Sequence, residues 1–133
     1  MDMTGVSTTE TNRRPRVVIV GGGFGGLHAA KALSNEAVDV TLIDRKNHHT
    51  FQPLLYQVAL ALLSPGEIAS SLRHILRASR NVRIILGEVI GFDIAARQVA
   101  LSDGTALEYE YLTVAAGARH AYYGPDEWER DAP

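Results

Sequence analysis

The sequence predicts an α/β fold in which helices flank a parallel β-sheet, and three observations support this class. Arg16–Val20 (RVVIV) and Val38–Ile43 (VDVTLI) are short, β-branched runs, as is typical of strands buried on both faces. Leu27–Leu33 (LHAAKAL), which lies between them, is rich in helix formers. A glycine-rich turn connects the first run to this helix. The order of strand, helix and strand indicates a βαβ unit.

Segments further along the chain extend this sheet and add an antiparallel part. Val82–Leu86 (VRIIL) is expected to be a third parallel strand, and Glu110–Ala115 (EYLTVA) a last one. Between them, residues 87–110 predict three short antiparallel strands, with Asp103-Gly104 at a hairpin turn. The predicted architecture is a parallel sheet with helices and a three-stranded antiparallel insert.

A further helix is predicted between the second and third parallel strands. Ser64-Pro65-Gly66-Glu67 has the form of a capping box, with proline at the first helical position. The apolar residues that follow fall on one helical face, and they are Ile68, Leu72, Ile75 and Leu76. The basic residues elsewhere around this helix are expected to form a solvated face, and they are Arg73, Arg77 and Arg80.

The composition of the 133-residue chain excludes several classes of protein. Its net charge of −2 gives no electrostatic reason to expect a nucleic acid partner. Cysteine is absent, which excludes disulfides, thiolate zinc sites and dithiol catalysis within this chain. No apolar run reaches the length of about 20 residues that crosses a bilayer. We expect a flexible tail at residues 1–15 and one partial domain at residues 16–133.

The glycine-rich turn carries a recognisable motif. Gly21-Gly22-Gly23-Phe24-Gly25-Gly26 satisfies the pattern G-x-G-x-x-G, and Asp44 closes the second strand about 20 residues later. This combination is typical of dinucleotide-binding domains. Gly21 permits the tight turn, Gly23 lets the backbone approach a pyrophosphate, and Gly26 lets the helix pack closely on the strand. The helix N-terminus then attracts the phosphates.

The acid at the end of the second strand narrows the choice of ligand. The carboxylate of Asp44 is expected to accept hydrogen bonds from both hydroxyls of a ribose, which disfavours a 2′-phosphate and therefore NADP. The motif does not separate FAD from NAD. The alternative is a glycine turn that binds nothing, with Asp44 as an ordinary surface acid. The complete order of strand, loop, helix, strand and acid favours the binding site.

Residues 45–59 (RKNHHTFQPLLYQVA) have neither helical nor strand periodicity, so we expect an irregular loop bent at Pro53. This loop resembles a motif of the type II, non-proton-pumping NADH:quinone oxidoreductases. The matching residues are Asp44, Arg45, Asn47, His49, Phe51, Gln52, Pro53, Leu54, Leu55, Tyr56, Gln57, Val58 and Ala59. The segments Gly87-Glu88-Val89 and Ala118–Trp128 are also similar to the family, and the antiparallel insert resembles that of its FAD-binding domain.

The resemblance implies a Rossmann-like FAD-binding domain, with FAD as cofactor and NADH as co-substrate. The cofactor-binding residues that it implies are Gly21, Gly22, Gly23, Phe24, Gly25, Gly26, Asp44, Arg45, Val89 and Gly117. It also implies a quinone pocket lined by Phe51, Gln52, Pro53 and Leu54. The family ends its last strand on Ala-Thr-Gly, whereas this chain has Ala115-Ala116-Gly117 and lacks the threonine. No catalytic side chain and no metal ligand are expected, because the flavin carries the chemistry, and the five histidines are expected to be structural or solvated.

By resemblance, the chain is the N-terminal FAD-binding fragment of an enzyme that passes electrons from NADH to a membrane quinone, and the fragment alone is expected to be inactive. The family binds NADH on a second glycine-rich domain and attaches peripherally to the inner face of the cell membrane through C-terminal helices. A cytoplasmic location and a possible homodimer are also implied. Alternatives are a non-catalytic adenine-dinucleotide-binding module, an inert truncated product, or a sulfide:quinone oxidoreductase, although the last class uses redox cysteines.

Overall fold

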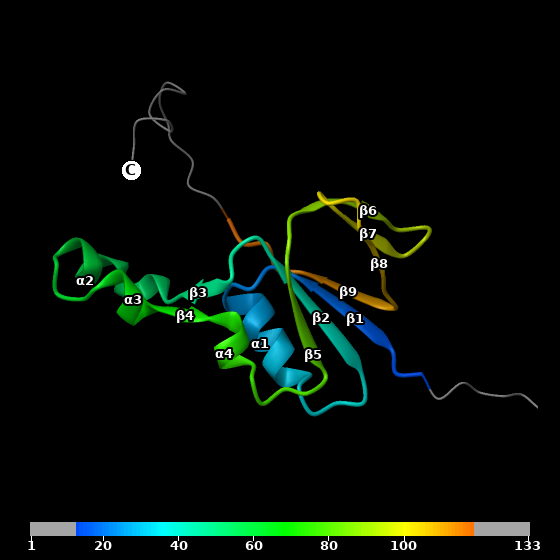
Figure 1. Cartoon of the computed structure of the whole chain (residues 1–133), viewed down its shortest axis with the longest axis horizontal. Coiled ribbons are helices and arrows are strands. Elements are labelled where there is room, and N and C mark those ends of the chain that lie inside the picture. The colour runs from blue at the N-terminus through cyan, green and yellow to red at the C-terminus, as the bar shows by residue number, and fades with distance from the viewer. Residues whose placement is uncertain (1–12, 119–133) are drawn as a thin grey trace, which may run out of the picture.

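A four-stranded parallel sheet forms the centre of the computed structural model, which describes residues 13–118 (Figure 1). Its strands are β1 (Arg16–Val20), β2 (Asp39–Asp44), β5 (Val82–Leu86) and β9 (Tyr111–Val114). They lie in the order β5-β2-β1-β9. All three strand pairs are parallel. The predicted α/β class and the four predicted parallel strands are therefore confirmed, with ends shifted by a residue at most in β2 and β9.

The core lies on both faces of this sheet, as expected for strands that are apolar throughout. On one face Val17 and Ile19 pack with Leu27 and Ala30 of α1 (Phe24–Ala32). On the other face Val18 and Val20 pack with residues of the antiparallel insert. Successive side chains of a strand point to opposite faces, so one five-residue strand supplies both clusters.

The antiparallel insert has the three strands that the sequence predicts. They are β6 (Val89–Asp93), β7 (Gln98–Leu101) and β8 (Ala106–Glu108), and they pair in chain order. At the hairpin turn Gly104 has a φ of +85°, a conformation that favours glycine. The N–H of Thr105 donates to Oδ1 of Asp103 at 2.9 Å. Val99 and Leu101 of this insert are buried against the sheet.

The single helix predicted after Ser64 is wrong, because a strand interrupts it. The chain forms α3 (Pro65–Ile68), then β4 (Ala69–Ser71), then α4 (Leu72–Ile75). The capping box does begin α3, where the carboxylate of Glu67 accepts a hydrogen bond from the Ser64 N–H at 2.6 Å. The helix stops because β4 pairs with β3 (His48–Thr50), and cross-strand hydrogen bonds replace the helical ones.

The irregular loop predicted at residues 45–59 is also wrong in part, because short elements form there. Strand β3 is followed by a 3₁₀-helix, η1 (Gln52–Leu54), and by α2 (Leu55–Ala59). Residues 48–71, here called the arm, extend away from the sheet in Figure 1. The arm exposes large apolar side chains, which are Phe51, Leu55, Tyr56, Leu60 and Leu62.

Candidate functional site

The glycine loop lies at the carboxyl end of the parallel sheet, directly after β1. Gly21 has a φ of +103° and donates its N–H to the carbonyl of Ile43 at 2.7 Å. A Cβ at this position would collide with the carbonyl oxygen of Ala115. A side chain is thus excluded at Gly21 both by the left-handed backbone and by the close approach of the chain after β9.

Gly26 is the second position where only glycine fits. A Cβ there would collide with the carbonyl oxygen of Gly21, so α1 passes very close to the turn that precedes it. This helix begins at Phe24, inside the glycine run and earlier than the helix-forming residues Leu27–Leu33 indicate. Its first internal bond runs from the Leu27 N–H to the Gly23 carbonyl at 2.9 Å.

Gly23 differs from both, because it faces open space. No atom lies within 4 Å of a Cβ built on it, so a side chain there would fill a space that is free. Four backbone N–H groups lie at the start of α1, and they belong to Gly23, Phe24, Gly25 and Gly26. None of them donates to a protein acceptor within residues 13–118. Free donors and the positive end of a nine-residue helix together suit an anionic phosphate.

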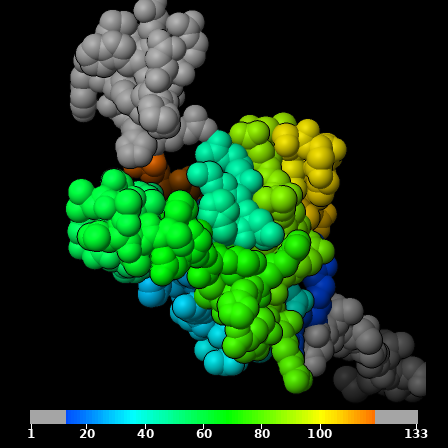
Figure 2. Space-filling view, turned by 60° about the vertical axis from the view of Figure 1, so that its left-hand side comes forward, coloured from blue at the N-terminus to red at the C-terminus, as the bar shows by residue number. Residues whose placement is uncertain are grey.

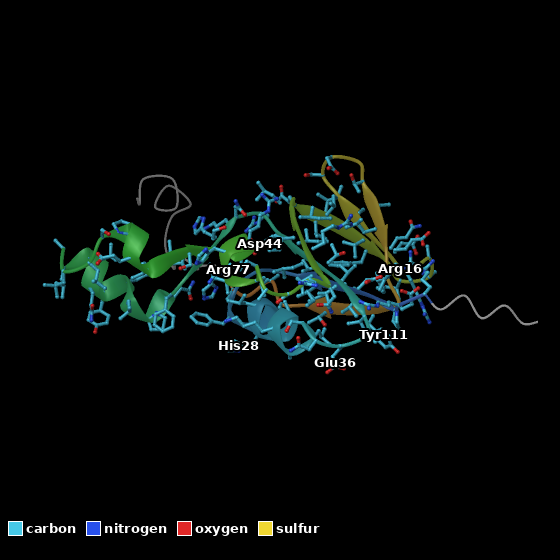
Figure 3. The ribbon with its side chains drawn as sticks, turned by 60° about the horizontal axis from the view of Figure 1, so that its bottom comes forward. Arg16, His28, Glu36, Asp44, Arg77 and Tyr111 are labelled. Carbon is cyan, nitrogen blue, oxygen red and sulfur yellow. The ribbon has the colours of Figure 1, made fainter. Side chains whose placement is uncertain are left out.

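Asp44 ends β2 beside this loop and holds it in place. Its Oδ2 accepts the N–H of Gly22 at 2.5 Å, and its Oδ1 accepts the N–H of Lys46 at 2.6 Å. Figure 3 shows Asp44 at the end of the sheet opposite Arg16. Each carboxylate oxygen keeps a second acceptor position, so Asp44 can hold the loop and still accept from a ligand hydroxyl.

Residues 44–45 and residues 87–89, which are distant in the sequence, lie side by side at the end of β2. The N–H of Gly87 donates to the Asp44 carbonyl at 2.9 Å. Nη1 of Arg45 lies 3.6 Å from Oε1 of Glu88 across this junction, with both side chains about half exposed. Val89, half-buried, begins β6 at the same place. The structure therefore brings Asp44, Arg45 and Val89 to one side of the glycine loop.

Gly117 lies on the chain that continues from β9. Its φ of +71° is again a conformation that favours glycine. The N–H of Ala115 donates to the Val20 carbonyl at 2.8 Å, which fixes this exit beside the glycine loop. A Cβ built on Gly25 would lie 3.5 Å from the Cβ of Ala115.

The expected quinone-pocket residues lie on the arm. Phe51, Gln52 and Pro53 are exposed, and Leu54 is half-buried. In Figure 2 the green residues of the arm protrude beside the body of the protein. Phe51 reaches the glycine loop, since its ring lies 5.7 Å from the ring of Phe24, edge to face. This aromatic pair connects the arm to the candidate cofactor site.

Sequence reasoning missed two residues that shape the loop. Leu72 is fully buried, and its Cδ1 lies 2.6 Å from the position that a Cβ on Gly22 would take. His49 approaches the Gly22 carbonyl through Nδ1 at 3.3 Å. Leu72 was assigned to a helical face, and His49 matched the family motif but was expected to be structural or solvated, so no signal connected either residue with Gly22.

Residues 13–118 provide neither a metal-binding cluster nor a membrane-spanning helix. They contain no group of three or more His, Asp or Glu side chains arranged to hold a metal ion. They also contain no helix with the length and apolar character needed to cross a membrane. The segment resembling a family motif at Ala118–Trp128 lies almost entirely outside the described residues.

Two solved structures with similar folds illustrate the architecture. NDH2 from Plasmodium falciparum superposes with a TM-score of 0.80 at 24% identity, over 89% of this chain and 25% of that one. The sulfide:quinone oxidoreductase of Aquifex aeolicus superposes with a TM-score of 0.72 at 26% identity, over 81% of this chain and 25% of that one. The likeness to the first supports the Rossmann-like fold with its antiparallel insert.

Sequence relatives are more specific. The chain is 54% identical to the type II NADH:quinone oxidoreductase NdhA of Mycobacterium tuberculosis over 90% of its length, and 49% identical to the Ndh protein of the same organism over 95%. It spans 26% and 28% of these two relatives, about a quarter of their length. Residues 15–127 match the family described as pyridine nucleotide-disulphide oxidoreductase. The chain therefore belongs to the pyridine nucleotide-disulphide oxidoreductase family.

Proposed function

We propose that this chain is the FAD-binding part of an NADH:quinone oxidoreductase. The observation that carries the proposal is the open space at Gly23, bordered by the free N–H groups of α1 and by Asp44. The identity with the two mycobacterial type II NADH:quinone oxidoreductases supports the choice of enzyme. A sulfide:quinone oxidoreductase is less favoured, because the identity to that structure is 26%, against 54% and 49% to the two mycobacterial relatives.

The residues present fit an adenine dinucleotide. The start of α1, from Gly23 to Gly26, would bind the pyrophosphate through backbone donors. Asp44 would accept from the ribose hydroxyls, while Arg45 and Val89 would border the adenine. Gly117 would allow the chain after β9 to pass close to the flavin end. When bound, the flavin would accept a hydride from NADH and pass the electrons to the quinone.

The arm would form part of the quinone pocket. Phe51, Gln52, Pro53 and Leu54 provide a mainly apolar surface, as an isoprenoid quinone requires. Phe51 connects this surface to Phe24 on the glycine loop, so the pocket would border the cofactor site. In this proposal the arm excludes water and orients the quinone, and it moves no proton.

The donor site lies elsewhere in this proposal. The sequence contains one G-x-G-x-x-G motif, so NADH would bind to a second dinucleotide-binding domain in the longer protein. Peripheral attachment to the inner face of the cell membrane and a homodimer also belong to that longer protein. The 133-residue chain alone would not oxidise NADH, because it would not hold NADH against the flavin. Orienting two reactants in this way lowers a reaction barrier by roughly 7–11 kcal/mol.

The test has a binding part and an activity part. Titration of the chain with FAD, followed by absorbance and calorimetry, should show saturable binding, and its absence would refute the proposal. A protein that carries this chain together with a second dinucleotide-binding domain should oxidise NADH with a soluble quinone. There, Gln52→Ala or Leu54→Ala should raise the quinone KM and leave flavin reduction by NADH nearly unchanged. Turnover with sulfide in place of NADH would favour the other enzyme.

A further inference from the structure

Gly22 is held through both polar groups of its backbone. Its N–H donates to Oδ2 of Asp44 at 2.5 Å, and its carbonyl oxygen accepts from Nδ1 of His49 at 3.3 Å. Leu72 packs against the same residue, where it occupies the space of a side chain. Residues of β2, β3 and α4, all more than 20 positions after Gly22 in the sequence, thus determine the conformation of one glycine.

The contact with Gly22 determines which nitrogen of His49 carries a proton. A carbonyl oxygen only accepts hydrogen bonds, so Nδ1 of His49 must be the protonated nitrogen in this contact. In the neutral ring Nε2 is then the free acceptor. The distance of 3.3 Å exceeds the usual value of about 2.9–3.0 Å for such bonds. The bond is therefore a weak one, and its contribution to the free energy of unfolding is small.

The orientation of this carbonyl determines where the next donor points. Residues 13–118 contain no cis peptide bond, and in a trans peptide the C=O and N–H point in opposite directions. His49 holds the Gly22 carbonyl, so the N–H of Gly23 points away from the imidazole. Gly23 is the loop residue with open space around it and an N–H that has no acceptor within the described range.

We propose that His49 is a positioning residue of the glycine loop, which presents the Gly23 N–H to a phosphate of the cofactor. This inference rests on the proposed function, because the phosphate is that of FAD. His49 does not contact the reacting atoms and acts only through Gly22. The chemistry it serves is recognition of a dinucleotide pyrophosphate by backbone donors.

The ring of His49 is itself fixed in position. Strand pairing places His49 opposite Ser70 in the β3–β4 hairpin. The Phe24 ring meets the imidazole edge to face, with centroids 4.7 Å apart and an interplanar angle of 86°. His48 is exposed, and successive residues of a strand point to opposite faces, so it points away from the loop. His48 therefore provides a matched control one residue away.

A first test needs no variant and no ligand. Nitrogen-15 NMR of the histidine rings in the 133-residue chain distinguishes the two neutral tautomers. We expect His49 to carry its proton on Nδ1, the less common tautomer of free histidine, and His48 to show no such preference. A proton on Nε2 of neutral His49 overturns the proposal, because no hydrogen bond to Gly22 would then exist.

A second test measures FAD affinity by calorimetry. His49→Phe keeps the ring packing and removes the donor, and it should weaken binding by about 2- to 10-fold, as expected for one neutral hydrogen bond. His49→Asn offers an amide N–H near the position of Nδ1 and should restore affinity to within about 2-fold of the parent. His48→Phe should match the parent. Thermal unfolding of each variant reports on folding separately.

The outcomes separate the two proposals. Failure of the parent chain to bind FAD refutes the proposed function, whatever His49 does. Parent-like affinity of His49→Phe overturns the positioning role alone. The same holds for two other results, equal weakening by His49→Phe and His49→Asn, or equal weakening by His48→Phe, since ring packing or hairpin stability would then be the cause.

Discussion

Arg16 binds Glu110 through two side-chain nitrogens and its own backbone. Nη2 and Nε of Arg16 lie 3.0 and 3.1 Å from Oε1 and Oε2 of Glu110, and the Arg16 N–H donates to Oε2 at 2.7 Å. Nη1 of Arg16 also donates to Glu108 at 2.6 Å. Arg16 begins β1, Glu108 ends β8 and Glu110 precedes β9. One arginine therefore joins the parallel sheet to the insert.

This arrangement predicts a pH dependence of stability. The hydrogen bonds from Arg16 lower the pKa of Glu110 from 4.5 to about 2. A carboxyl group whose pKa is lower in the folded state stabilises the fold above its unfolded pKa, and this contribution is lost as pH falls through the folded pKa. The parent chain should therefore be more stable than Glu110→Gln at about pH 6. The difference between their free energies of unfolding should shrink as the pH falls from about 4.5 to about 2.

Urea unfolding of both proteins across this range measures the difference in free energy of unfolding. Glu36→Gln is the control, because the Glu36 side chain makes no hydrogen bond or ion pair within the described part of the chain. A difference between parent and Glu110→Gln that is independent of pH would show that the charge of Glu110 does not contribute. Salt should reduce the effect, since both side chains are about one-third exposed.

Substitutions at two glycines of the loop should affect FAD binding and the stability of the fold differently. Gly23→Val places a side chain in open space on an extended backbone, so the free energy of unfolding should change by only about 0.5 kcal/mol. FAD binding should nevertheless be lost, because the side chain would occupy the pyrophosphate position. Gly26→Ala drives a methyl group into the Gly21 carbonyl and should cost about 1–3 kcal/mol or more. Unchanged FAD affinity in a folded Gly23→Val would contradict the site.

Asp44 should affect binding in two ways. It accepts from Gly22 within the loop, and in the proposal it also accepts from the ribose. Asp44→Ala should lose about 1–3 kcal/mol of FAD binding free energy. Calorimetry with ADP and with 2′,3′-dideoxy-ADP separates the two effects. The loss should be larger for ADP, and an equal loss for both ligands would mean that Asp44 acts only through the loop.

Asn81 should be essential for the turn that follows α1. Its amide nitrogen donates to the carbonyls of Leu33, Val38 and Glu36 at 2.8, 3.0 and 3.2 Å. Asn81→Ala removes all three bonds and leaves the partly buried Val38 carbonyl without this donor, whereas the Leu33 carbonyl still accepts from the Glu36 N–H at 3.1 Å. The change should cost about 1–3 kcal/mol by urea unfolding. Asn81→Asp should be no less harmful, because a carboxylate would face three carbonyls.

The matched control for this prediction is Asn35→Ala, at an exposed position in the same turn. It should change the free energy of unfolding by no more than about 0.5 kcal/mol. If Asn81→Asp were as stable as the parent, the three hydrogen bonds would contribute nothing to the fold.

The sequence by itself determined the four parallel strands, the glycine loop and the insert. Apolar, β-branched runs such as Arg16–Val20 are typical of strands that are buried on both faces. Gly21 and Gly26 are prescribed by backbone geometry, and Asp44 by its place at the end of a strand. The hairpin turn at Asp103-Gly104 is likewise local chemistry. In each case the signal and the structure it predicts lie within a few residues of each other.

The tertiary structure decided what happens between residues 45 and 76. Ile68 and Leu72 have helical spacing, yet Ala69–Ser71 form a strand, because pairing with His48–Thr50 satisfies their backbone groups. The register of that pairing turns His49, and not His48, toward Gly22. A shift of one residue would exchange the two histidines. No local pattern encodes this choice, since it depends on hydrogen bonds between segments about 20 residues apart and on the packing of Leu72 beneath the loop.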